Sequence, residues 1–219
     1  MSTTKHWLAP GTSFDTPYYV IKGNSKGPTF MITAGIHGSE IASILAAQKL
    51  TNIQIKRGTI ILVPIVNMRA FHRRIRGVPD VNRTFPRTPN DAARGLLAKN
   101  LFRLTRHFRP KWVLDLHEAI GFSKIDPRKL GQSILTNPRS MAISTAKRVI
   151  NHINHSIQRK SRQFTIHLWE KPGTFRTATA RLLGTQALTV ETSIHLPLSV
   201  RVKFQERIVR SFLREAGLL

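Results

Sequence analysis

The chain has 219 residues and carries 35 Lys and Arg against 11 Asp and Glu, a formal net charge of +24. Apolar residues make up 41% of it, too many for a disordered basic tail, so the charge belongs to a folded body with a sizeable core. Cysteine is absent, which excludes disulfides, thiolate catalysis and cysteine-based metal sites.

Nothing in the sequence predicts export or membrane insertion. The N-terminus lacks the apolar core of a signal peptide, and the longest aliphatic stretch, residues 59–66, is too short to span a membrane. We therefore expect a soluble, cytoplasmic protein with a strongly positive surface. This charge is compatible with nucleic acid, an anionic polymer or an acidic substrate as partner, and equally with a merely solvated basic surface. The oligomeric state is not indicated.

Short segments rich in β-branched residues alternate along the chain with segments of helical periodicity. Strands are predicted at 18–22, 29–34, 59–66, 112–116, 133–136, 164–168 and 187–191. Helices are predicted at 39–50, 90–108, 140–157 and 199–216. The alternation predicts a single-domain α/β fold, a three-layer α/β/α sandwich around a mixed, largely parallel sheet. The polar segment 67–90, rich in Arg and Pro, has neither periodicity and is expected to be a long functional loop.

The first chemical motif is AGIHGSE, residues 34–40, between a predicted strand and a predicted helix. His37 and Glu40 are three residues apart, so at such a turn both side chains can reach one point. Imidazole and carboxylate are both zinc ligands in proteins. By itself, the pattern more often reflects a helix capped by Ser39 beside an unrelated glutamate.

The second motif, DLHE, ends another apolar strand. His117 would be a third ligand, completing the set of two histidines and one carboxylate that is typical of hydrolytic zinc sites with one open position. Asp115 lies on the same face of this strand, where it could orient an imidazole or form an ordinary salt bridge.

Glu191 ends a third apolar strand, where a carboxylate is costly unless it has a partner or a task such as general base. In the loop 67–90, Arg76, Asn82 and Arg83 could bind a carboxylate or an oxyanion, or belong to a solvated or nucleic-acid-binding surface. Few acidic residues are available, yet several fall at these motifs, which favours a functional interpretation. They are Glu40, Asp80, Asp115 and Glu191.

Taken together and in order, these motifs resemble those of the zinc carboxypeptidase superfamily, specifically its succinylglutamate desuccinylase/aspartoacylase branch. The matching stretches are AGIHGSE, N-x-x-A at 67–70, Arg76, DVNRTFP at 80–86, DLHEA at 115–119 and TVETS at 189–193.

The resemblance implies one zinc ion held by His37, Glu40 and His117. It also implies Glu191 as general base and later proton donor, and Arg76 as the residue that polarises the scissile carbonyl. Asn82 and Arg83 would bind the substrate carboxylate. Arg181, ten residues before Glu191, matches a further substrate-binding arginine of the aspartoacylase-like members.

We therefore expect a zinc-dependent hydrolase that cleaves an amide bond next to a carboxylate and deacylates an N-acyl amino acid. One alternative is a metallocarboxypeptidase that trims a peptide C-terminus. An alternative of another class is a basic nucleic-acid-binding protein on an inactive scaffold, and polyanion contact through the basic surface is compatible with all three. Residues 1–219 are expected to form the catalytic domain alone, without the additional C-terminal β domain of the aspartoacylase-like enzymes.

Overall fold

Runs of Ile, Leu, Val and Phe form strands buried on both faces at the centre of the molecule, in a computed structural model that describes residues 1–219. The strands are β1 (Ser2–Leu8), β2 (Thr16–Lys22), β3 (Ser25–Ala34), β4 (Arg57–Val63), β5 (Trp112–Ala119), β6 (Ser133–Thr136), β7 (Thr165–Leu168) and β8 (Gln186–Ser193). The central strands are apolar along most of their length because helices cover them on both sides.

All eight strands belong to one sheet, in the order β1-β2-β4-β3-β5-β8-β6-β7. The four central strands β4, β3, β5 and β8 are parallel, whereas β2 joins β4, and β6 joins β8, in antiparallel fashion. The predicted mixed, largely parallel sheet is confirmed. Ligand sites in such sheets form beyond the carboxyl ends of the parallel strands.

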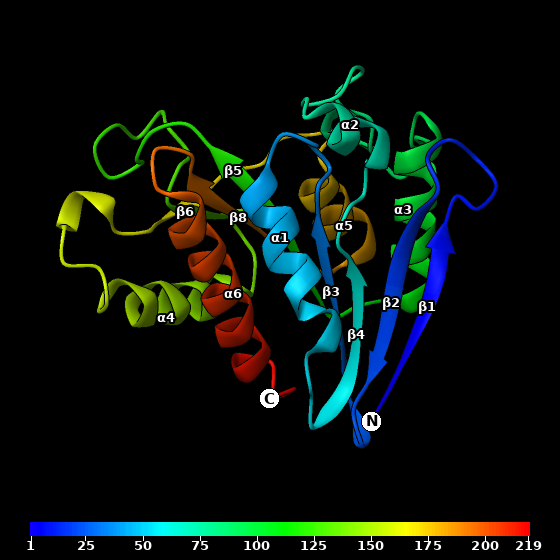
Figure 1. Ribbon diagram of the computed structural model, residues 1–219, viewed down its shortest axis with the longest axis horizontal. Coiled ribbons are helices and arrows are strands. Elements are labelled where there is room, and N and C mark those ends of the chain that lie inside the picture. Colours follow the sequence, from blue (N-terminus) through cyan, green and yellow to red (C-terminus); the bar gives the residue numbers. More distant parts are fainter.

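Helices cover both faces of the sheet (Figure 1). They are α1 (Ile41–Lys49), α2 (Met68–Arg73), α3 (Leu96–Phe108), α4 (Ile143–Asn154), α5 (Phe175–Leu183) and α6 (Leu198–Glu215). The first core cluster joins the sheet to α1, α4 and α6, and the second joins it to α3 and α5. The predicted three-layer α/β/α architecture is therefore confirmed. No helix combines the length and the apolar character needed to cross a membrane.

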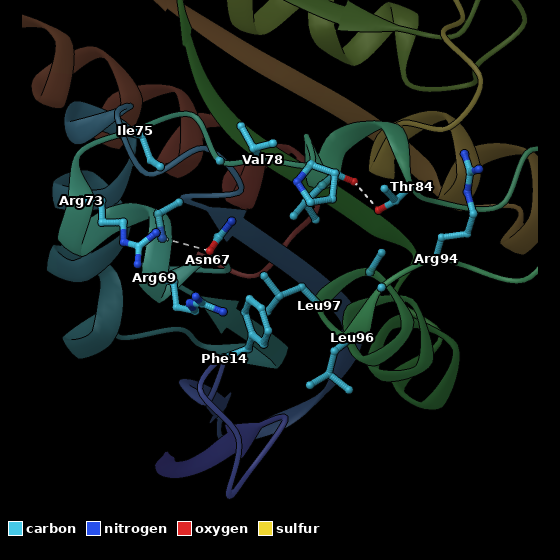
Figure 2. Close-up of a pocket in the computed structure, with 16 residues that line it drawn as sticks. Phe14, Asn67, Arg69, Arg73, Ile75, Val78, Thr84, Arg94, Leu96 and Leu97 are labelled. Carbon is cyan, nitrogen blue, oxygen red and sulfur yellow. Dashed lines mark hydrogen bonds between the residues drawn. The ribbon is translucent and has the colours of Figure 1, made fainter.

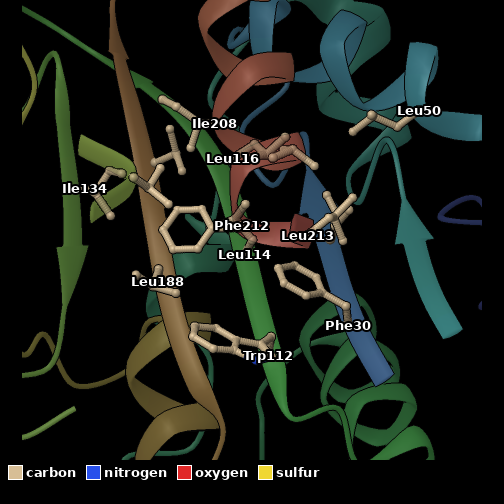
Figure 3. Packing of buried hydrophobic residues seen from close by; sticks show 14 of the residues in the cluster. Phe30, Leu50, Trp112, Leu114, Leu116, Ile134, Leu188, Ile208, Phe212 and Leu213 are labelled. Carbon is tan, nitrogen blue, oxygen red and sulfur yellow. The ribbon is translucent and has the colours of Figure 1, made fainter. Parts of the chain in front are cut away.

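The larger core cluster is built around aromatic rings that come from distant parts of the chain (Figure 3). Phe30 of β3 stacks on Trp112 of β5 with ring centroids 6.2 Å apart, and Phe212 of α6 packs against the same indole at 6.3 Å. This contact fixes α6 against the middle of the sheet.

The structure contains all the predicted strands and helices, with shifted ends, and three elements that the periodicity did not predict. Strand β4 ends at Val63 rather than at residue 66, because the following Pro64 has no N–H to continue a ladder. The edge strand β1 is exposed along nearly its whole length, so it lacks an apolar alternation. Helix α5 is short and rich in Thr and Ala, and the six-residue α2 lies inside the segment predicted to be a loop.

Replacing Phe212 by Ala should lower the free energy of unfolding by about 3–5 kcal/mol, because a large side chain that is almost completely buried leaves a cavity. Leu198→Ala, on the same helix but 41% exposed, is the matched control and should cost less than about 1 kcal/mol. Urea denaturation followed by circular dichroism measures both. Equal effects of the two variants would contradict the assigned packing of α6.

Candidate metal centre and active site

The turn between β3 and α1 carries the first two candidate ligands, and two glycines make it possible. Gly35 adopts a φ of +67°, which side chains disfavour. At Gly38 a Cβ would lie 2.0 Å from the carbonyl carbon of Ala70, so only glycine allows α2 to pack against this turn. The turn thereby directs His37 and Glu40 to the carboxyl end of the sheet.

His37, Glu40 and His117 are all buried and form the group of side chains best suited to hold a metal ion. Their ligand atoms all lie within 4.8 Å of one another. The Nδ1 atom of His37 is 2.6 Å from Glu40 Oε1, and the Nδ1 atom of His117 is 2.8 Å from Glu40 Oε2. The structure thus brings together the three residues predicted as zinc ligands.

Each histidine directs its other ring nitrogen toward an aspartate. His37 Nε2 is 3.0 Å from Asp80 Oδ1, and His117 Nε2 is 2.7 Å from Asp115 Oδ2. Thr33 in turn donates a hydrogen bond of 2.6 Å to Asp115 Oδ1. Carboxylates in this position fix the tautomer and the orientation of metal-binding imidazoles.

This arrangement fits a bound cation. A neutral imidazole that donates its Nε2–H to an aspartate carries a lone pair on Nδ1. Both Nδ1 atoms face oxygens of Glu40 at hydrogen-bond distance, and such a contact needs a proton or a metal ion between the two lone pairs. Glu40 Oε2 is buried and makes no hydrogen bond of acceptable geometry, as expected of an oxygen that a metal would coordinate.

The titration of these groups reflects their mutual attraction. Burial alone would raise the pKa of Glu40, but His117 and His37 outweigh it and lower this pKa to about 2. Burial would likewise lower the pKa of His117, but Asp115 and Glu40 raise it well above its ordinary value. Without a metal, a proton on His117 therefore compensates part of the negative charge of the carboxylates.

Helix α6 ties the elements that carry the ligands to one another. Glu118, next to His117, accepts a 2.8 Å hydrogen bond from the Ala42 N–H at the start of α1 and also pairs with Arg201 of α6. Gln205 Nε2 donates to the carbonyl oxygen of His117 at 2.7 Å. The relative positions of Glu40 and His117 thus depend on α6.

Glu191 lies on β8 directly opposite His117 of β5. It is 9% exposed, and its Oε2 atom has no hydrogen-bond partner. Burial, reinforced by the carboxylates of Glu40 and Asp115 and opposed by His117, raises the pKa of Glu191 to about 8. A carboxyl group of this kind can accept and release a proton near neutral pH.

A cleft of about 370 Å³ opens over these groups. Arg76 is half-exposed at its wall and donates hydrogen bonds of 3.1 and 2.9 Å from Nε and Nη2 to Asp80. Asn82 Oδ1 accepts from the Phe175 N–H at 2.8 Å, which leaves its Nδ2 group directed toward His117. Arg83 completes this wall, so Arg76, predicted to polarise the scissile carbonyl, lines the cleft together with the predicted substrate-binding residues Asn82 and Arg83.

Arg181 does not reach this cleft. It lies on the exposed side of α5, with its Nη1 atom 3.8 Å from Glu170. Arg176, on the same helix, lines the cleft instead and is almost completely buried. Its guanidinium donates to Asn137 and to the carbonyl oxygen of Trp169, and no carboxylate lies within ion-pairing distance. Burial lowers the pKa of Arg176 to about 10.

Arg176 and Glu118 are the residues that sequence reasoning missed, and Asp80 received no role from it. The clearest available signal was the run DVNR, in which an aspartate precedes two predicted substrate-binding residues. Asp80 links His37 to Arg76 and also accepts from the Asn82 N–H at 2.9 Å. Arg176 gave no comparable signal, because its helix was not predicted.

Comparison with known proteins agrees with this geometry. Residues 26–215 match the family model of the succinylglutamate desuccinylase/aspartoacylase catalytic domain. A succinylglutamate desuccinylase of Pseudomonas aeruginosa is 31% identical over 95% of this chain and 63% of its own length. An N-alpha-acetyl-L-2,4-diaminobutyric acid deacetylase of Halomonas elongata is 33% identical over 47% of this chain and 32% of its own length. The chain thus spans less than two thirds of the length of the desuccinylase and about one third of the length of the deacetylase.

Solved structures share the fold. Csd4 of Helicobacter pylori, a D,L-carboxypeptidase, superposes with a TM-score of 0.74 at 20% identity, over 88% of this chain and 52% of Csd4. An aspartoacylase family protein of Mesorhizobium loti gives 0.69 at 24% identity, over 100% of this chain and 67% of that protein. The predicted family and fold are confirmed.

Asp115→Asn should weaken zinc binding about 10- to 100-fold, because the amide orients the His117 imidazole less well than the carboxylate does. Competition with a chromophoric chelator measures this affinity, and Asp91→Asn, at an exposed position outside the cleft, is the matched control. Unchanged affinity in Asp115→Asn would show that this aspartate does not support a metal ligand.

Glu191→Gln should change how stability depends on pH in the metal-free protein. The folded chain holds the Glu191 proton up to a pKa of about 8, whereas the unfolded chain releases it near the ordinary value of 4.5. The free energy of unfolding should therefore fall as pH rises between these values, by about 1 kcal/mol per pH unit, and level off above them.

Glutamine does not ionise, so this contribution is absent from Glu191→Gln, and the variant should gain stability relative to wild type as pH rises from 5 to 8. Urea denaturation in the presence of a chelator measures the difference at each pH. A difference that stays constant with pH would mean that Glu191 is ionised throughout.

Proposed function

Because this chain belongs to the succinylglutamate desuccinylase/aspartoacylase family, a family of hydrolases, we propose that it is a zinc-dependent deacylase that cleaves the amide bond of an N-acyl amino acid. One observation carries the proposal. The buried, unpartnered carboxyl of Glu191 stands opposite His117, beside a set of two histidines and one glutamate whose ligand atoms converge. This combination is typical of metal-assisted hydrolysis.

His37, Glu40 and His117 would hold the zinc ion, with Asp80 and Asp115 orienting the two imidazoles. Zinc in such a site supplies a Lewis acid that polarises a carbonyl group and makes water more acidic.

Glu191 is placed to move the proton. In its ionised form the Oε2 atom, free of any hydrogen bond, accepts a proton from the attacking water. The raised pKa then lets the same carboxyl deliver the proton to the amine nitrogen as the amide bond breaks. A carboxylate stabilised by strong donors would be too weak a base to take the proton from water in the first step.

Arg76 and the Asn82–Arg83 pair bind the substrate on the opposite wall. Arg76 is half-exposed, with hydrogen bonds to Asp80 and only a longer contact of 3.9 Å to Glu40 Oε1, so its guanidinium can turn to an oxyanion that forms at the scissile carbonyl. Arg83 offers a planar fork to the substrate carboxylate, and the Nδ2 group of Asn82, whose only hydrogen-bond contact is a long one of 3.4 Å to His117 Nε2, adds a neutral donor.

The charge of the cleft favours an acidic substrate. The cationic residues that line the cleft are Arg76, Arg83, Arg128, Lys129, Lys171 and Arg176. Like charges repel, so these groups disfavour the free amine of a diaminobutyrate derivative and favour an amino acid with two carboxylates. Arg176, which lacks any carboxylate partner, is suited to bind the second one. We therefore propose an N-acyl acidic amino acid, such as N-succinyl-glutamate, as the substrate class.

A nucleic-acid-binding protein on an inactive scaffold has less support. An inactive scaffold has no need of the orienting aspartates and the unpartnered buried Glu191 carboxyl, and both are present. The basic surface outside the cleft is compatible with either activity.

Zinc-loaded protein should hydrolyse N-succinyl-L-glutamate at least about tenfold more efficiently than N-acetyl-L-2,4-diaminobutyrate or a tripeptide with a free C-terminus. Release of the free amine measures kcat/KM for the three compounds. Arg176→Gln should raise KM for succinylglutamate without lowering the bound zinc, whereas Arg181→Gln, on the exposed side of the same helix, should change neither.

Glu191→Gln should lower kcat by about 10²- to 10⁴-fold while zinc stays bound. Activity that survives this change would assign the proton transfer to another group. Preferential cleavage of the tripeptide would favour the carboxypeptidase, and a protein that takes up no zinc would contradict the hydrolase altogether.

A further inference from the structure

A second cavity of about 320 Å³ lies behind the wall of the metal cleft (Figure 2). The segment 76–84 separates the two spaces. Arg76, Asn82 and Arg83 line the metal cleft, whereas the intervening Gly77–Pro79 and Val81 line the second cavity. The rest of its lining comes from α2, from the start of α3 and from Phe14 in the loop after β1.

Much of this cavity is apolar, and its apolar surface extends to solvent. Phe14, Ala70 and Leu97 contribute to the lining. Val78, which is 96% exposed, and the partly exposed Ile75 (42%) and Leu96 (39%) surround the same opening. Exposed aliphatic side chains gathered around a cavity are typical of a binding site for an apolar group.

Hydrogen-bond donors without acceptors also line the cavity. Helix α3 begins after Gly95, which has no side chain to cap it, and its first turn contains no acidic residue. The backbone N–H groups of Leu96, Leu97 and Ala98 donate to no acceptor in the protein. Such a helix start attracts an anion, but the feature is common and does not identify a site without further evidence.

Asn67 supplies that evidence. Its side chain is 5% exposed and contributes to the cavity lining. Its Oδ1 atom accepts from the Ala70 N–H at 3.1 Å and so caps α2, which fixes the orientation of the amide. The Nδ2 group points away from this bond and donates to nothing in the protein (Figure 2). A buried donor left without an acceptor is costly unless a ligand or water satisfies it.

The charge around the opening has one sign. Arg69, Arg73 and Arg94 line the cavity, none of them forms an ion pair, and no acidic residue is among the lining residues. Arg69 rests on the ring of Phe14, 5.0 Å from its centroid, so cationic and apolar surfaces adjoin. This combination is complementary to a molecule with an apolar body and an anionic group.

We propose that this cavity is a second binding site, for a small carboxylate with an apolar body. The apolar body packs against Phe14, Leu97 and the Val78–Pro79 segment. The carboxylate accepts from donors that the protein leaves free, namely Asn67 Nδ2, the first amides of α3 and the neighbouring arginines. The site requires neither zinc nor Glu191 and is therefore independent of the hydrolase activity proposed above.

Isothermal titration calorimetry with octanoate tests the proposal. Octanoate should bind zinc-loaded protein saturably at one site, and chelation of the zinc should leave its affinity unchanged. Acetate, which lacks the apolar body, and 1-octanol, which lacks the charge, should each bind at least about tenfold more weakly.

The double variant Arg73→Gln/Arg94→Gln should weaken octanoate binding about tenfold. Lys99→Gln/Arg106→Gln removes the same charge from exposed positions of α3 outside the cavity and should have no effect. Absence of saturable binding, binding lost with the zinc, equal affinity for 1-octanol, or equal weakening by the two double variants would each overturn the proposal.

Discussion

His117 and Glu191 face the same space because β5 and β8 run parallel and stay in register from Trp112 opposite Gln186 to Ala119 opposite Ser193. A slip of one residue would turn one of the two side chains to the other face of the sheet. Such a slip would also move apolar side chains from one core cluster into the other, where they would not fit, so packing on each side of the sheet enforces the register. The geometry of the candidate site is in this sense a property of the core.

The same arrangement concentrates negative charge in the interior. Glu40, Asp115 and Glu191 are buried around the two imidazoles, and Asp80 beside them is only partly exposed; isolated buried carboxylates would be very unfavourable. Partners offset the cost for three of them, through hydrogen bonds and ion pairs with the histidines, Arg76 and Thr33. Glu191 has no such partner and instead holds a proton to higher pH. One group of carboxyls therefore contains both strongly acidic and weakly acidic members, as sites that combine metal binding with proton transfer require.

The sequence predicts the site better than it predicts its surroundings. Polar residues at the ends of apolar strands converge when the strands are parallel, which made His37, Glu40, His117 and Glu191 candidates, and the family resemblance supplied their expected roles. Arg181 was selected by its spacing from Glu191, but in α5 it lies about 140° around the helix from Arg176. Of these two residues, only Arg176 faces the cleft. Spacing alone does not identify a helix face when the helix is short and its Thr and Ala residues carry no apolar period. The edge strand β1 was missed for a related reason, because it buries almost nothing.

The contacts of α6 also have a consequence for the order of assembly during translation. His37, Glu40 and His117 emerge from the ribosome before β8 does, and α6 emerges after β8. Glu191 enters the centre of the sheet only with β8, and the carbonyl group of His117 finds its donor only when Gln205 has been synthesised. A nascent chain thus carries every candidate metal ligand before it carries the group that would move the proton. The centre becomes complete only once the helix that ties β5 to α1 has been synthesised and has docked.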